Sequence, residues 1–195
     1  MDGTAPHRAA AQARLQVAGK DAPRTHSNPG RRLGTAARGG VVMSEPRIQD
    51  FLQRQHTRYE LIHHARTLTA QETAASAHIR GQLLAKTVMV NLDGRLAMVV
   101  VPASKRVHFG RLCRETGAQA AELATESEFC ELFPDCEVGA MPPFGNLYGI
   151  EVYVDESLVS DADIAFNAGT HTEVVRMPYS EFERLVAPHH VHLMH

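Results

Sequence analysis

Between residues 83 and 102 the chain is almost continuously apolar, and the run is interrupted by one polar pair, Asp93-Gly94. An Asp-Gly pair between two apolar segments is the strongest short-range signal of a tight β-hairpin turn. Neither segment shows the alternation of a half-exposed strand, so the pattern predicts a central hairpin that is covered on both faces. Lys86 is the one charged residue within its first strand.

Helical patterns lie on both sides of this hairpin. Segments 47–55 and 104–117 place apolar residues on one helical face, and the second is expected to end at Gly117. A Ser or Thr followed three residues later by Glu is a capping box, which marks a helix start. Three such pairs are present: Thr69 with Glu72, Thr125 with Glu128, and Ser180 with Glu183. The helix that begins after Thr69 is expected to end at Gly81.

Shorter extended segments complete the pattern. We predict strands within 58–65, 118–123 and 148–158, and two more within 163–177 around Gly169 and Thr170. Helices and strands alternate irregularly around the hairpin. This order favours an α/β fold of the α+β type, a mixed sheet with helices packed against it, over a doubly wound parallel sheet.

Charge divides the chain into two parts. Residues 1–42 carry a net charge of +5 and no aromatic residue, and the remainder carries −7. The first part has too few large apolar side chains to offset the entropy of ordering, so we expect it to be disordered. Its sequence is compatible with a transit peptide, a basic arm for nucleic acid, or sequence upstream of a natural start at Met43. We favour the last, with 43–188 as a single domain and 189–195 as a frayed His-rich tail.

Cysteine use and hydropathy narrow the class of protein. Cys113, Cys130 and Cys136 are odd in number and lack CxxC spacing, which argues against a disulfide framework and a zinc ribbon. No apolar run is long enough to span a bilayer. We therefore expect a cytoplasmic protein without a metal or another cofactor. A thiol hydrolase is an alternative, but no cysteine has a recognisable His and acid context.

Two side chains are candidates for chemistry. Lys86 in an apolar strand either keeps its head in water along an edge or anchors a phosphate or a carbonyl oxygen. His171 follows Gly169 in a turn between strands, where a histidine is commonly solvated but can also contact a ligand. The residues alone leave both alternatives open.

The segment "GAMPPFG", residues 139–145, is the most unusual connection. Adjacent prolines exclude a helix or a central strand, because they lack amide donors and fix their own φ angles. Such a segment serves as a plain rigid connection or as the rim of a binding site. In a rim, proline orders the backbone and glycine lets a ligand approach the amides.

Taken together, "LLAKTVMV", "GAMPPFG" and "FNAGTHTEVVRM" resemble the YbaK/prolyl-tRNA synthetase editing-domain family of aminoacyl-tRNA deacylases, from about Thr69 to Val186. The resemblance implies a partly barrel-like mixed sheet flanked by helices. It also implies that Lys86 lines the pocket for the 3′ end of tRNA and that Gly169 and His171 form the opposite wall. The family's GxxxP loop falls on Gly139 to Pro143. The residues so assigned to substrate binding are Gly139, Met141, Pro142, Pro143, Phe144, Gly145 and Gly169.

The implied activity is that of a free-standing trans-editing deacylase, which hydrolyses the ester of a mischarged tRNA without a metal. Lys86 would contact phosphate or carbonyl, loop amides would stabilise the oxyanion, and His171 would position substrate or act as a base. The acceptor stem would meet the basic patch of Lys105, Arg106 and Arg111. A synthetase is a further candidate partner. The alternative is a non-catalytic module that binds a nucleotide or an aminoacyl-tRNA 3′ end in the same pocket.

Overall fold

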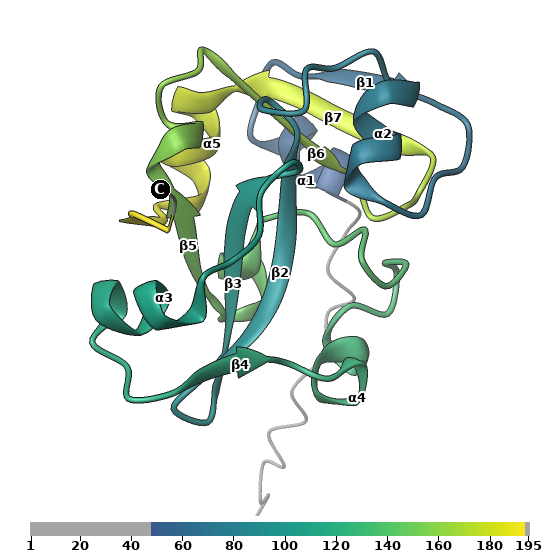
Figure 1. Ribbon diagram of the computed structural model, residues 1–195. Helices are drawn as coiled ribbons and strands as arrows, with labels where there is room; N and C mark the ends of the chain where they lie inside the picture. Colours follow the sequence, from purple (N-terminus) through teal and green to yellow (C-terminus); the bar gives the residue numbers. More distant parts are fainter. Residues whose placement is uncertain (1–47, 194–195) are drawn as a thin grey trace, which may run out of the picture. The chain divides into compact units, whose positions relative to one another are not determined.

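The computed structural model describes residues 48–193, which form two sheets with short helices around them (Figure 1). Residues 1–42, expected to be disordered, lie outside this range. The helices are α1 Ile48–Arg54, α2 Ala70–Ser76, α3 Phe109–Thr116, α4 Glu126–Phe129 and α5 Tyr179–Val186, with short 3-10 turns at Cys130–Leu132, Gly145–Tyr148 and Glu156–Leu158. The strands are β1 Glu60–His63, β2 Ala85–Leu92, β3 Arg95–Pro102, β4 Ala121–Leu123, β5 Glu151–Asp155, β6 Asp163–Asn167, β7 Glu173–Pro178 and β8 His189–Val191.

The predicted hairpin is confirmed as the pair β2 and β3, joined through Asp93 and Gly94. Both turn residues have positive φ, 49° and 83°, as a two-residue turn of type I′ requires. Strand β3 is buried on both faces. Met98 and Val100 pack into the larger core, whereas Val99 and Val101 pack against a second cluster that includes Leu112 of α3. The near absence of alternation in the sequence reflects this double burial.

The sheets have different topologies. The larger has the order β4-β2-β3-β5-β8, with β5 parallel to both of its neighbours and the hairpin antiparallel. The smaller has the antiparallel order β1-β7-β6. The predicted mixed sheet with flanking helices is therefore confirmed. The strands of residues 48–193 form two separate sheets rather than a closed barrel.

One bridge connects the sheets. Leu84, next to β2, pairs in parallel with Ala165 of β6, and the Ala165 amide donates to the Leu83 carbonyl at 3.0 Å. Two residues further along both strands lie Lys86 and Asn167. Because parallel strands keep their register, the bridge brings Lys86 beside the segment that leads into the turn of Gly169 and His171.

Helix α2 ends earlier than predicted. It ends at Ser76, and His78 rather than Gly81 takes the left-handed conformation, with φ of 55°. The His78 amide donates to Ala75 O and the Ile79 amide to Ala74 O, at 3.2 and 2.8 Å. These two bonds form a Schellman motif, which satisfies the last carbonyls of the helix even though its left-handed residue is not glycine.

The three predicted capping boxes have different outcomes. Those of Thr69 with Glu72 and Thr125 with Glu128 are confirmed. The third is wrong, because α5 begins at Tyr179 after Pro178 and no side chain caps it. Ser180 therefore lies inside the helix, where it cannot serve as the N-cap residue.

The expectation of a frayed tail is also wrong for residues 189–193. β8 pairs with β5, and the Leu193 amide donates to the buried carboxylate of Asp155 at 2.9 Å. Val191 and Leu193 are buried in the core cluster on the α3 side. Two apolar residues at alternate positions are sufficient to dock this short segment.

Candidate functional site

Lys86 lies in the first half of β2, before the part that pairs with β4. Its side chain is partly buried, and its ammonium group donates to the Ala103 carbonyl at 3.4 Å. Burial lowers the pKa of Lys86, and the neighbouring Arg106 guanidinium lowers it further. No carboxylate of residues 48–193 forms an ion pair with it. The group is thus a cation beside a second cation, an arrangement that attracts an anion or a carbonyl oxygen.

The 139–145 loop is mainly part of the core. Met141, Pro142, Pro143, Phe144 and Gly145 are all buried, and only Gly139 is exposed. The Phe144 ring is fully enclosed and lies 5.9, 5.5 and 5.7 Å from the rings of Phe51, Phe166 and Phe182. An aromatic cluster in the core therefore packs against the loop through Phe144.

Gly145 is required by packing. A Cβ on this residue would lie 2.8 Å from the Ile150 carbonyl oxygen, a distance that real Cβ atoms essentially never show. Glycine at this position lets the loop pass close to the start of β5. Packing alone therefore accounts for Gly145.

The amides of the loop differ in availability. Ala140 N donates to Glu137 O at 2.9 Å and Phe144 N to Pro142 O at 2.8 Å. Among residues 48–193, the amides of Gly139, Met141 and Gly145 have no hydrogen-bond partner. Gly139 is the exposed one of the three, and its φ of 85° is accessible mainly to glycine. Its amide is therefore exposed and free to donate.

The turn of Gly169 and His171 contacts this loop directly. Gly169 N donates to Ala140 O at 3.0 Å, and Glu137 N donates to Gly169 O at 2.8 Å. His171 is buried, and its Nε2 atom donates to the Val138 carbonyl at 2.9 Å. A carbonyl can only accept, so Nε2 carries the proton of this bond.

A carboxylate that the sequence reasoning missed completes this junction. Glu137 accepts the His171 amide at 2.6 Å through one oxygen and the Arg66 guanidinium at 2.7 Å through the other. These two bonds lower the pKa of Glu137, the His171 amide more than Arg66. Its position two residues before Gly139 was the only sequence signal available. We call Arg66, Glu137, Val138, Gly169 and His171 the loop–turn junction.

Asn167 was also missed. It precedes the turn on β6, beside Lys86, and its side-chain oxygen is buried without a hydrogen-bond partner in the described part of the chain. A buried acceptor without a partner costs about 1–3 kcal/mol, and such groups in native proteins call for an explanation. This polar side chain lies on the segment of β6 that runs from the bridge at Ala165 to the junction.

Comparison with known proteins agrees with this arrangement. A family model described as "Aminoacyl-tRNA editing domain" matches residues 64–185, well over half of the chain. The match covers Lys86, the 139–145 loop and the loop–turn junction. The chain belongs to the aminoacyl-tRNA editing domain family.

Individual relatives support the assignment. Proline–tRNA ligases of Bacillus mycoides (strain KBAB4) and Bacillus cereus (strain AH187) are each 30% identical over 90 residues, which is 46% of this chain and 16% of the ligase. The chain thus matches only a small part of these enzymes.

Two solved structures share the fold of this editing domain. One is a protein proposed to be a trans-editing enzyme for prolyl tRNA synthetase, with a TM-score of 0.66, 22% identity, and coverage of 76% of this chain and 95% of that one. A scaffold protein used for computational epitope grafting has a TM-score of 0.66 at 19% identity, with the same coverage of both chains.

The environment of Cys136 does not favour a thiol nucleophile. Burial, with a smaller contribution from Asp135, raises the pKa of the Cys136 thiol to about 11, which disfavours the reactive thiolate. Its sulfur packs behind Gly169, 3.4 Å from where a Cβ would be. Residues 48–193 contain no cluster of His, Cys, Asp or Glu that could hold a metal ion. Within the same residues, no helix has both the length and the apolar character to cross a bilayer.

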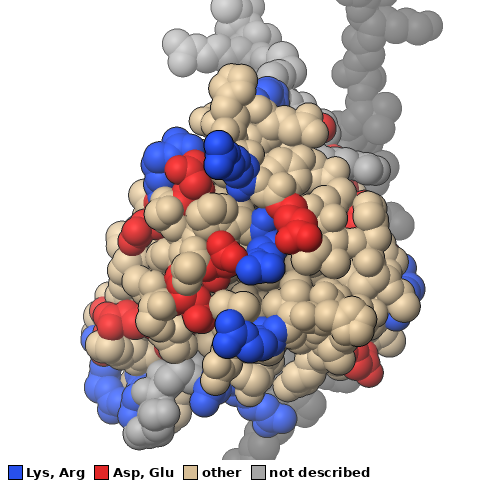
Figure 2. Space-filling view, turned by 90° about the horizontal axis from the view of Figure 1, so that it is seen from above, with Lys and Arg blue, Asp and Glu red and all other residues tan. Residues whose placement is uncertain are grey.

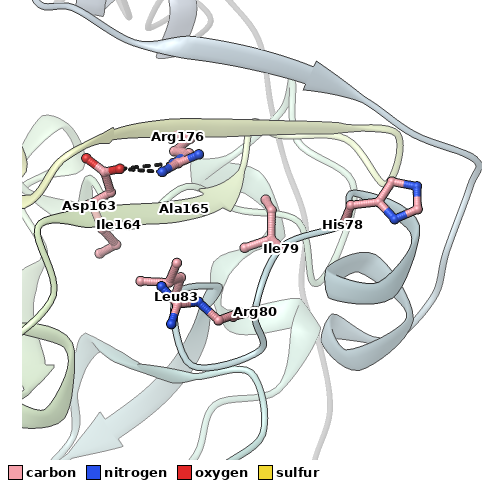
Figure 3. A pocket seen from close by; sticks show the side chains of 8 residues that line it. All are labelled: His78, Ile79, Arg80, Leu83, Asp163, Ile164, Ala165 and Arg176. Atoms are coloured by element: carbon pink, nitrogen blue, oxygen red, sulfur yellow. Dashed lines mark hydrogen bonds and ion pairs between the residues drawn. The ribbon is translucent and has the colours of Figure 1, made fainter.

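A separate cavity of about 180 Å³ lies between the segment that follows α2 and strands β6 and β7 of the smaller sheet (Figure 3). Ile79, Arg80 and Leu83, from the loop after α2, face β6 and β7 across it. On the side of the cavity formed by the sheet, Arg176 and Asp163 pair with each other: the Arg176 guanidinium donates twice to the Asp163 carboxylate, at 2.6 and 3.0 Å. Lys86 and the loop–turn junction do not line this cavity.

Charged side chains on one face of the editing domain are mixed in sign. Figure 2 shows basic and acidic groups interspersed, without a broad basic surface in that view. The net charge of −7 after residue 42 agrees with this distribution. A protein that gripped tRNA widely would need a basic footprint on some face.

Proposed function

We propose that this editing domain is a free-standing aminoacyl-tRNA deacylase that hydrolyses the ester of a mischarged tRNA. The observation that carries the proposal is that the family match contains Lys86, the loop–turn junction, and the Leu84–Ala165 bridge that connects the strand of Lys86 to the strand leading into the junction. A cytoplasmic location is part of this proposal.

Lys86 is proposed as the electrostatic anchor. It has no acidic partner in the described chain, and Arg106 lies close enough to disfavour its charge. An incoming phosphate or ester carbonyl would relieve that repulsion. The bond to Ala103 O is long, at 3.4 Å, so a stronger acceptor can replace it at little cost.

The Gly139 amide is proposed to stabilise the oxyanion. Attack of water on the ester carbon places negative charge on the carbonyl oxygen, and the bond to the ribose oxygen then breaks to give the free amino acid and the tRNA hydroxyl. An aminoacyl ester is already activated, so placing the water and stabilising this charge meet most of the need. His171 is proposed to position the substrate, with Nδ1 as the nitrogen that could accept a proton.

Contact with the rest of the tRNA is proposed to be limited to the 3′ end and the first part of the acceptor stem. Lys105 and Arg106 lie on the exposed turn after β3, next to Lys86. A few cations at this place suit a short stretch of backbone, which agrees with the mixed charge of the molecule.

The test is release of labelled amino acid from a panel of tRNAs, including tRNA for proline charged with Ala, Ser or Cys. Lys86→Met keeps the aliphatic stem and removes the ammonium group. We expect it to lower kcat/KM on the preferred substrate by about a hundredfold. Lys105→Ala, on the neighbouring turn, is the matched control and should mainly raise KM in a salt-dependent manner.

The competing function is a binding module with the same pocket. If folded wild-type protein hydrolyses no member of the panel, yet binds a non-hydrolysable aminoacyl-adenosine analogue in a manner that needs Lys86, the module is correct. Equal activity of Lys86→Met and wild type would show that Lys86 is not the anchor.

A further inference from the structure

The loop–turn junction contains a carboxylate whose contacts exceed those of an ordinary surface ion pair. Glu137 bonds the turn of Gly169 and His171, more than thirty residues away, at two points: its carboxylate accepts the His171 amide and its own amide donates to the Gly169 carbonyl. The His171 amide, which it accepts at 2.6 Å, belongs to a residue that is only 8% exposed. A charged acceptor on a backbone amide is among the stronger hydrogen bonds in proteins.

The remaining bonds of the junction depend on this one. His171 Nε2 reaches Val138 O only if the backbones of residues 138 and 171 keep their separation. Thr67 N donates to the His171 carbonyl at 3.2 Å, so residues 66–67 hold the same residue from the other side. Arg66, next to Thr67 in the chain, donates to the second carboxylate oxygen of Glu137 at 2.7 Å, so segment 66–67 contacts both Glu137 and His171.

We propose that Glu137 is a positioning residue of the aminoacyl pocket: it holds the His171 imidazole and the Gly139 amide in a fixed relation to each other. This inference rests on the proposed function. Without the carboxylate, the His171 amide loses its acceptor and the turn can move away from the loop. A displacement of about 1 Å in a catalytic group can lower the rate by about a hundredfold.

Three substitutions separate this role from a general loss of stability. Glu137→Ala removes both bonds, and we expect kcat to fall at least tenfold with a smaller change in KM. Glu137→Gln keeps an oxygen acceptor for the His171 amide and should recover much of the activity. Arg66→Ala leaves the carboxylate on that amide and should have the smallest effect of the three.

The matched control is Glu181→Ala. Glu181 also pairs with an arginine, Arg184, at 2.7 Å and with similar exposure, but it lies on α5 away from the junction. It should leave kcat unchanged. Activity of Glu137→Ala within twofold of wild type, or an equal loss in Glu181→Ala, would overturn the proposal.

A second readout does not require turnover. In nitrogen-15 NMR spectra, the His171 Nε2 proton should be visible because it is bonded to Val138 O, and it should exchange rapidly with water in Glu137→Ala. If wild type hydrolyses no substrate, the proposed function fails while this signal still tests the junction. An unchanged signal in Glu137→Ala would show that Glu137 does not hold His171.

Discussion

The turn of the β2–β3 hairpin and the loop–turn junction are both short connections with glycine at positive φ, but their causes differ. Asp93 and Gly94 adopt their conformations because of their own chemistry and the strands on either side. Gly169 is held by bonds to Glu137 and Ala140, which are distant from it in sequence and lie on either side of Gly139 in the loop. Local rules are therefore sufficient for the first connection and not for the second, and the proposed chemistry depends on the second.

The largest expected effect comes from the aromatic support of the loop. Phe144→Ala removes a fully buried ring that contacts three others, so we expect a loss of about 3–5 kcal/mol in unfolding free energy. Urea denaturation measures this loss. Leu68→Ala, at a side chain that is 77% exposed, is the control and should change stability little. A loss below about 1 kcal/mol for Phe144→Ala would mean that the loop does not depend on this cluster.

Two glycines without positive φ give the next comparison. Gly145→Ala would place Cβ 2.8 Å from the Ile150 carbonyl, and overpacking of this kind costs about 1–3 kcal/mol. Gly81→Ala has nothing within 4 Å and should be neutral or slightly stabilising. Thermal unfolding of the two variants checks the difference. Equal melting temperatures would contradict the close approach at Gly145.

The hairpin turn can be tested at Gly94, because the bonds of this turn to Gln119 and Ala120 are made by Asp93. Gly94→Ala has open space around it but forces an L residue into φ of 83°, for a cost of about 1–2 kcal/mol. Gly94→Asn should cost less, because asparagine tolerates the left-handed region. The ratio of the two losses in chemical denaturation reports on the backbone alone. If Asn is as destabilising as Ala, the turn is not limited by its own conformation.

The smallest expected effect is the change with pH that accompanies protonation of Glu137 in the loop–turn junction. Because the pKa of Glu137 is lowered in the folded protein, its contribution is present above the ordinary glutamate value and is lost as the pH falls through the folded pKa. The amide proton shift of His171 should therefore titrate with a midpoint below the ordinary pKa of a glutamate. Glu137→Gln should abolish this step. A midpoint at or above the ordinary value would argue against the short bond to the His171 amide.

The same contrast explains what could be predicted from the sequence. The hairpin, the mixed sheet and two capping boxes depend on neighbouring residues and were predicted correctly. The third capping box failed because Pro178 starts α5 at Tyr179. Helix α2 ended early because a Schellman motif formed at His78, where no glycine marks it. Both errors concern a helix end that tertiary contacts can shift.

The sequence indicates Lys86 of the candidate site and does not indicate Glu137 or Asn167. Lys86 was identified because a lone charge in an apolar strand conflicts with burial. Glu137 and Asn167 gave no comparable signal, since acids and amides are common in loops and at strand ends. Their significance comes from the bond to the His171 amide and from the β2–β6 bridge, which join residues far apart in the chain. The periodicity of apolar residues along the sequence does not predict contacts of this kind.

The β2–β6 bridge has a consequence for the order of assembly. Leu84 and Ala165 are separated by most of the domain, so their pairing must wait until the chain between them has been made and closed into a loop. The hairpin can form as soon as its own residues are available. The hairpin that carries Lys86 can therefore form before β6 has been made, and the site becomes complete only when β6 and the turn after it have been added.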